Sequence, residues 1–181
     1  MFIKKIENIK VDLCQIKKDL SWILTKTQWL PENQIGLTHR PSTLNDLWKD
    51  NVGGLYDKER KKELISENEF TELNPASPKY TRDILLQLAK QEGFGLGRVR
   101  YMLLDTKQGL TVHRDTSVRY HLAIDTNPYA YIAHSVNTNS VKAMCYHLPD
   151  DGNFYCINTK QEHFVYNGGA ESRIHLVICP I

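Results

Sequence analysis

Residues 111–124 read TVHRDTSVRYHLAI, two short runs of strand-forming residues joined by a polar turn. In an extended chain, side chains two positions apart point to the same face. His113 and Asp115 therefore share a face and can reach one ion. Imidazole and carboxylate groups are common ligands of first-row transition metals. The stretch predicts a strand that ends in two metal-ligating side chains, followed by a second strand.

The same texture continues from residue 98 to the C-terminal end. Short runs rich in Val, Ile, Tyr and Leu alternate with turn residues about every ten positions, and no helical pattern interrupts them. The predicted strands are 98–104, 111–113, 119–124, 131–136, 142–148, 154–157, 163–167 and 173–179. Eight short strands after a helical front half predict a mainly β (α+β) fold, a jelly roll or barrel braced by N-terminal helices.

The front half has a different periodicity. Apolar residues at steps of three and four predict an amphipathic helix over residues 2–25 that packs on a core, with a coiled coil as the competing interpretation. A second helix is predicted over 81–90, ending at Gly93, and a short one over 58–66. Residues 34–37 read as a strand. The stripe of the first helix is Phe2, Ile6, Ile9, Leu13, Ile16, Leu20 and Ile23.

Composition is that of an ordinary globular protein, with 41% hydrophobic and 24% charged residues among 181. The formal charge of +2 does not predict nucleic-acid binding. The chain has neither a run of about 20 apolar residues nor the features of a secretory signal, so a soluble cytoplasmic protein without a membrane partner is expected. We expect a single domain over 1–181, with a helical and irregular front over 1–92 and a β core over 97–179.

The four cysteines match neither the spacing of a zinc site nor a disulfide framework. We expect Cys14, Cys145, Cys156 and Cys179 to be buried, reduced thiols.

His163 and Arg173 extend the pattern begun by His113 and Asp115. Two histidines and one carboxylate on one face of an octahedral ion leave three positions open, as in the facial triad of non-haem Fe(II) oxygenases. Arg173 lies ten residues after His163 in the apolar run RIHLVI. A buried guanidinium is costly unless an anion pairs with it, and its planar fork suits a carboxylate.

With these residues, the chain resembles the 2-oxoglutarate- and Fe(II)-dependent oxygenases and, within them, the aspartyl/asparaginyl β-hydroxylase family. The likeness extends from about residue 97 to 178. It rests on GRVRYMLL (97–104), HRD (113–115), RYHL (119–122), HFVYN (163–167) and RIHLV (173–177).

The resemblance implies a double-stranded β-helix with the metal at its mouth. His113, Asp115 and His163 would hold Fe(II), and Arg173 would bind the far carboxylate of 2-oxoglutarate, with Arg119 and His121 helping to hold it. The implied cofactors are Fe(II), 2-oxoglutarate as cosubstrate and O2. The implied reaction hydroxylates an amino-acid or peptidyl side chain and releases succinate and CO2, so the partner is a small molecule or a peptide.

Several residues keep two interpretations. His121 is either a cosubstrate contact or a core histidine satisfied by a backbone carbonyl. His175 either supports the site from behind or fills the core, and Asn167 either supports the site or holds a turn. No function is assigned to His39, His134 and His147. Four arginines are expected to be solvated charges, with Arg114 pointing away from the metal: Arg40, Arg98, Arg100 and Arg114.

Two other classes of function compete with the oxygenase. One is a cupin-like metal enzyme that uses the same ligands without 2-oxoglutarate, such as a thiol dioxygenase or an isomerase. The other is a non-catalytic jelly-roll binding module. The position of Arg173 argues against the first class, and the complete set of ligands argues against the second.

Overall fold

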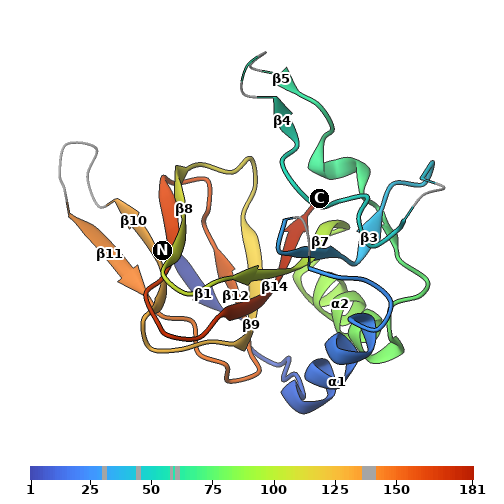
Figure 1. Cartoon of the computed structure of the whole chain (residues 1–181), viewed down its shortest axis with the longest axis horizontal. Helices are drawn as coiled ribbons and strands as arrows, with labels where there is room; N and C mark the ends of the chain where they lie inside the picture. Colours follow the sequence, from blue (N-terminus) through green and yellow to red (C-terminus); the bar gives the residue numbers. More distant parts are fainter. Residues whose placement is uncertain (30–31, 44–45, 58, 60–61, 136–141) are drawn as a thin grey trace. The chain divides into compact units, whose positions relative to one another are not determined.

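The structure is a computed structural model that describes residues 1–29, 32–43, 46–57, 59, 62–135 and 142–181. It contains two α-helices, a short 3-10 helix and a series of strands (Figure 1). In chain order these are β1 (Ile3–Lys5), α1 (Leu13–Ile23), β2 (Gln34–Gly36), β3 (Thr38–His39), β4 (Tyr56–Asp57), β5 (Lys62–Glu63), η1 (Glu67–Glu69), β6 (Glu72–Leu73), α2 (Lys79–Glu92), β7 (Leu96–Leu104), β8 (Gln108–His113), β9 (Arg119–Asp125), β10 (Ala130–Ser135), β11 (Ala143–Tyr146), β12 (Phe154–Ile157), β13 (His163–Asn167) and β14 (Arg173–Pro180).

The chain forms two compact units. We call them the β unit, residues Met1–Leu13 and Leu103–Leu176, and the helical unit, residues Cys14–Met102 and Val177–Ile181. β14 runs through both. Every residue that the sequence predicts to contact the metal or the cosubstrate belongs to the β unit.

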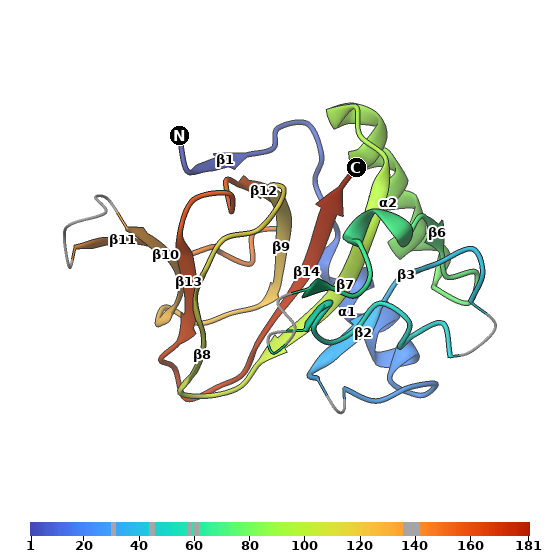
Figure 2. The same cartoon turned by 90° about the horizontal axis from the view of Figure 1, so that it is seen from above.

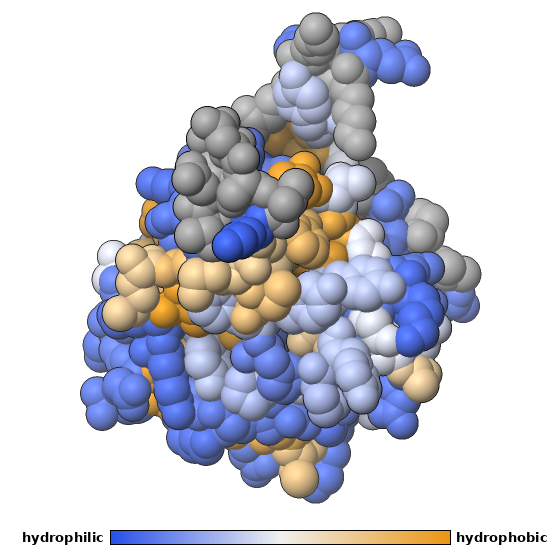
Figure 3. Space-filling model, turned by 90° about the vertical axis from the view of Figure 1, so that its left-hand side faces the viewer, coloured by the Kyte–Doolittle hydropathy of each residue, from blue (hydrophilic) through white to orange (hydrophobic). Residues whose placement is uncertain are grey.

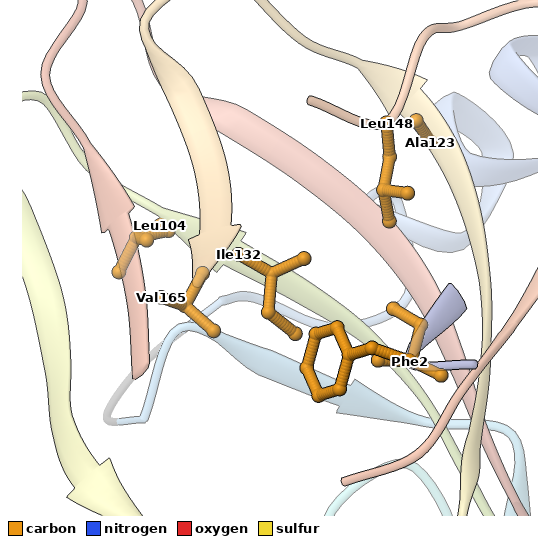
Figure 4. Packing of buried hydrophobic residues seen from close by; sticks show 7 residues of the cluster. Phe2, Leu104, Ala123, Ile132, Leu148 and Val165 are labelled. Carbon is orange, nitrogen blue, oxygen red and sulfur yellow. The ribbon is translucent and has the colours of Figure 1, made fainter. Parts of the chain in front are cut away.

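The β unit has two sheets (Figure 2). One is the antiparallel sheet β11-β10-β13-β8, and the other contains β1, β12, β9 and the first half of β14 in that order. The chain passes between them repeatedly: β8 lies in the first sheet, β9 in the second, β10 and β11 in the first, β12 in the second, and β13 in the first. This alternation is the topology of a double-stranded β-helix, so the predicted fold class is confirmed. The core of the unit contains residues from both sheets (Figure 4), namely Phe2, Leu104, Ala123, Ile132, Leu148, Ile157 and Val165.

All eight predicted C-terminal strands are present, within a few residues of their expected bounds; residue 136 lies outside the described residues. The predicted strand at 34–37 is β2, and the predicted second helix is α2. The α2 helix ends at Gly93, whose φ of 71° is the left-handed conformation that glycine adopts readily.

The predicted helix over 2–25 is wrong in its first half. Helix α1 begins only at Leu13, and residues 3–5 form β1, in which Ile3 lies opposite Ile157 of β12. The amide of Ile6 donates to the carbonyl of Phe154 at 2.8 Å. Asn8 has a φ of 66°, which a right-handed helix does not allow. Phe2, Ile6 and Ile9 are still buried, but this segment pairs with β12 instead of forming a helix. The second half of the stripe is buried on α1 as predicted, through Ile16, Leu20 and Ile23.

Three other expectations need correction. Residues 58–66 do not form a helix where they are described: β4 and β5 pair instead, and residues 58, 60 and 61 lie outside the described part. The four cysteines, all within the described residues, form no disulfide, but Cys14 and Cys145 are exposed and Cys156 is half-buried, so only Cys179 is buried as expected.

Arg98 and Arg100 in the helical unit are buried rather than solvated. Arg98 donates to the carbonyl of Asn51 at 2.6 Å, and Arg100 donates to the Gln34 side chain at 2.8 Å. Burial lowers the pKa of Arg98 to about 9. These polar partners make it possible for the guanidinium groups to leave water.

Among the described residues we find no helix with the length and apolar character needed to cross a membrane.

The position of Phe2 in the β unit's core leads to a stability prediction. Phe2→Ala should lower the free energy of unfolding by about 3 kcal/mol, because a buried aromatic ring is lost and a cavity remains. Leu86→Ala, on an exposed part of α2, is the control and should change it by less than about 0.5 kcal/mol. Urea unfolding measures both, and equal small effects would contradict the position of Phe2.

Candidate metal centre

Three predicted ligands from the β unit lie together. His113 ends β8 and His163 begins β13, and the two residues lie opposite each other in the paired strands. Their ring centroids are 4.3 Å apart. Asp115 follows β8, and its amide donates to the carbonyl of Thr159 at 2.9 Å. One ligand atom from each of the three residues lies within 4.8 Å of the others. A single ion can therefore contact all three.

Backbone carbonyls orient both histidines. Nδ1 of His113 lies 2.7 Å from the carbonyl oxygen of Thr111, and Nδ1 of His163 lies 3.0 Å from that of Gln161. A carbonyl can only accept, so each Nδ1 carries the hydrogen and each Nε2 keeps a lone pair for a metal. Burial is the main reason that the pKa of His163 is lowered, which favours the neutral form that metals bind.

The carboxylate of Asp115 has a different neighbour at each oxygen. Oδ2 lies 3.7 Å from Nε2 of His163, and Oδ1 lies 3.2 Å from Nη2 of Arg119. Arg119 also donates to the hydroxyl of Ser117 at 2.6 Å. These contacts orient the carboxylate. The role of Arg119 toward the cosubstrate stays a prediction.

Arg173 is buried at the start of β14, with 6% of its surface exposed. It forms no hydrogen bond or ion pair with any residue that the structure describes, and its Nε is a buried nitrogen without a partner. Burial lowers its pKa to about 10, so it is still a cation at neutral pH. An isolated buried cation is strongly unfavourable. The carboxylate of 2-oxoglutarate would supply the missing anion, so this residue fits the predicted cosubstrate.

The interior faces of β9 and β14 connect Arg173 with the metal ligands. Arg119 and His121 share one face of β9, and Arg173 and His175 share one face of β14, because each pair is two residues apart. Nδ1 of His121 lies 3.3 Å from Nδ1 of His175. Arg119 in turn contacts Asp115. The four side chains form a buried polar strip inside the unit.

The other sequence candidates lie at the edges of this site. Asn167 is fully buried and donates to the carbonyls of Leu104, Asp105 and Glu171 at 3.1, 3.1 and 2.8 Å. These bonds fix the turn that leads from β13 to Arg173. Arg114 is exposed and forms a salt bridge with Glu162 at 3.2 Å, pointing away from the ligands as predicted.

Sequence reasoning missed His134. It lies opposite His163 in the paired strands β10 and β13, so both side chains are on the same face. Its ring stacks on Phe2 with centroids 4.1 Å apart, and its Nε2 lies 3.3 Å from the hydroxyl of Tyr146. Only the strand register places it next to a ligand, and no spacing motif in the sequence encodes that register.

Comparison with known proteins gives one matching family and several solved structures with a similar fold. A model of the aspartyl/asparaginyl beta-hydroxylase family matches residues 11–179. No curated protein matches the chain.

Solved structures are similar at low sequence identity. AviO1 from Streptomyces viridochromogenes has a TM-score of 0.54 and 13% identity, over 98% of this chain and 88% of that one. A prolyl hydroxylase from Trichoplax adhaerens, solved with a hypoxia-inducible-factor peptide, has a TM-score of 0.50 and 11% identity, over 99% of this chain and 83% of that one. IDO from Bacillus thuringiensis has a TM-score of 0.50 and 10% identity, over 99% of this chain and 90% of that one. These likenesses show the fold.

The geometry of the three ligands predicts how metal binding depends on them. His113→Ala and His163→Ala should each weaken Mn(II) binding by more than about 100-fold, because each removes a neutral nitrogen donor. Calorimetric titration of the metal-free protein measures this. His147→Ala is the control, since His147 is exposed and is not one of the three predicted ligands; its Nδ1 lies 3.0 Å from the carbonyl oxygen of Ala130. Wild-type affinity in either ligand variant would show that the metal lies elsewhere.

Proposed function

The chain belongs to the aspartyl/asparaginyl β-hydroxylase family, and we propose that it hydroxylates an amino-acid or peptidyl side chain using Fe(II), 2-oxoglutarate and O2. Succinate and CO2 are the expected co-products. The family match supports hydroxylation in general terms. The arrangement of ligands and of buried charge in the β unit supports the choice of metal and cosubstrate.

His113 and His163 would hold Fe(II) through Nε2, and Asp115 through its carboxylate. When bound, Fe(II) together with 2-oxoglutarate supplies the O2 activation that hydroxylation of an unactivated C–H bond requires. The protein's own contribution is orientation. Thr111 and Gln161 fix the imidazole rings, and Arg119 holds one oxygen of Asp115 while the other oxygen faces His163.

The observation that carries the choice of cosubstrate is the unpaired buried charge of Arg173. A metal enzyme of the cupin type that works without 2-oxoglutarate does not need a guanidinium here, and neither does a binding module. Asp115, the carboxylate of the metal site, already pairs with Arg119. The partner for Arg173 would therefore come from a ligand, and a dicarboxylate offers one carboxylate to Arg173 and another to the metal.

The surface next to the metal ligands supports a substrate that is presented on a peptide. β8, which ends at His113, is an edge strand with exposed Leu110 and Val112, and Met144 of β11 is also exposed. Apolar residues gather on this side of the molecule (Figure 3). Patches of this kind often contact a partner.

Removing the charge of Arg173 should have opposite effects on the stability of the ligand-free protein and on cosubstrate binding. Arg173→Met should raise the free energy of unfolding of the ligand-free protein by about 1–3 kcal/mol, because an uncompensated buried charge is replaced by an apolar chain. The same variant should lose 2-oxoglutarate binding. Urea unfolding and calorimetry measure the two effects, and Arg114→Met, at an exposed position, should change neither. A variant that is less stable yet still binds 2-oxoglutarate would exclude the role given to Arg173.

The reaction itself is tested by succinate formation. With Fe(II), O2 and 2-oxoglutarate, a panel of free amino acids and of Asp-, Asn- and Pro-containing peptides should include one that raises succinate release well above the uncoupled rate. The stimulating compound should gain 16 Da by mass spectrometry, as expected for one added oxygen atom. Asp115→Ala is the matched loss-of-activity variant. Metal-dependent turnover of a substrate without any need for 2-oxoglutarate would favour the cupin-type alternative.

A further inference from the structure

Two buried histidines in the β unit lie within hydrogen-bond distance of each other. His121 of β9 and His175 of β14 approach through Nδ1 at 3.3 Å, with their rings at 81°. Both are buried, with 7% and 2% of their surface exposed. The pKa of His175 lies well below its ordinary value because of burial, and next because of the charges on Arg173, His121 and His147. His175 is therefore neutral, and a bond between two Nδ1 atoms needs one of them to donate and the other to accept.

The surroundings of Nε2 of His175 indicate which of the two histidines donates. Nε2 of His175 is buried and has no hydrogen-bond partner within the described ranges. If His175 accepted at Nδ1, its Nε2 would carry a buried hydrogen with no acceptor, near the cationic Arg173. If His175 donates at Nδ1, its Nε2 is a lone pair in the field of that cation. The second arrangement has the lower energy, because a buried unpaired N–H is costly and a nearby positive charge favours a lone pair.

This arrangement determines the other ring as well. When Nδ1 of His121 accepts from His175, a neutral His121 carries its hydrogen on Nε2 and is a donor there. Arg119 and His121 are on the same face of β9, next to the metal ligands and the strand that carries Arg173. A donor in this strip matches an anionic ligand and repels a cationic one.

We propose that His175 is a positioning residue: it donates to His121 and holds His121 as an Nε2–H donor for a carboxylate of the cosubstrate. The role toward the cosubstrate rests on the proposed function, whereas the tautomers of the pair do not. This positioning role explains why β14 carries a histidine between Arg173 and the apolar end of the strand. An apolar residue at that position would have a lower desolvation cost.

NMR spectroscopy determines directly which ring nitrogens of His121 and His175 carry a hydrogen. Long-range ¹H–¹⁵N correlation spectra of the metal-free full chain distinguish protonated from unprotonated ring nitrogens, and His121→Asn and His175→Phe assign the signals. The expected result is a hydrogen on Nδ1 of His175 and on Nε2 of His121. The reverse pattern, or a doubly protonated ring in the pair at neutral pH, would overturn the proposal.

Affinity for 2-oxoglutarate tests the consequence. In Mn(II)-loaded protein, His175→Phe should weaken 2-oxoglutarate binding by about tenfold, since the donor state of His121 is no longer fixed. His175→Asn keeps an amide donor near the position of Nδ1 and should stay within about threefold of the wild type. Leu86→Ala is the control, because Leu86 is exposed on α2, and its affinity should not change.

The results separate this proposal from the one on which it rests. Unchanged affinity in His175→Phe, or equal loss in the Phe and Asn variants, would overturn the positioning role, the second result indicating a packing role only. A wild-type protein that binds Mn(II) but no 2-oxoglutarate would overturn the proposed function instead. The tautomer spectra need neither metal nor cosubstrate, so they decide the state of the pair in either case.

Discussion

A buried positive charge with no partner in the described part of the chain is the constraint around which the β unit is arranged. Arg173 is held at the start of β14, and Asp115, the carboxylate of the metal site, is already bound by Arg119. The two arginines therefore have different tasks, although both lie inside the same unit. Arg119 balances a charge that the protein supplies. Arg173 has no such partner among the described residues, and under the proposed function the carboxylate of a ligand would supply the balancing charge.

The metal ligands depend on backbone pairing in the same way. His113 and His163 come together because β8 and β13 place them opposite each other, and the carbonyl two residues before each histidine sets its tautomer. A slip of one residue in this register would turn one imidazole to the outer face. Asn167 contributes from further along β13, because its hydrogen bonds fix the turn that brings the chain to Arg173. The positions of the predicted ligands and of Arg173 are thus consequences of one strand arrangement.

Sequence reasoning succeeded where local pattern and fold agree. Period-two runs between turn residues located the eight strands, and the His-x-Asp spacing with a later histidine singled out three side chains that the structure brings within 4.8 Å of one another. It failed where long-range pairing decides. The segment around Phe2 has a helical period but becomes a strand because β12 offers an edge, and Asn8 ends any helix there. Arg98 looks like a surface charge until the loop carbonyl that accepts from it is known. His134 becomes interesting only through the register of β10.

The central claim is that the His113–Asp115–His163 centre and Arg173 together hold Fe(II) and 2-oxoglutarate. The most direct test is the absorption spectrum of the protein with Fe(II) under strict exclusion of oxygen, as 2-oxoglutarate is added. The account predicts a visible metal-to-ligand charge-transfer band that saturates with 2-oxoglutarate in the wild type and is absent in Arg173→Met at the same concentrations. A protein that binds Fe(II) but shows no such band, or the same band and affinity without Arg173, would contradict it.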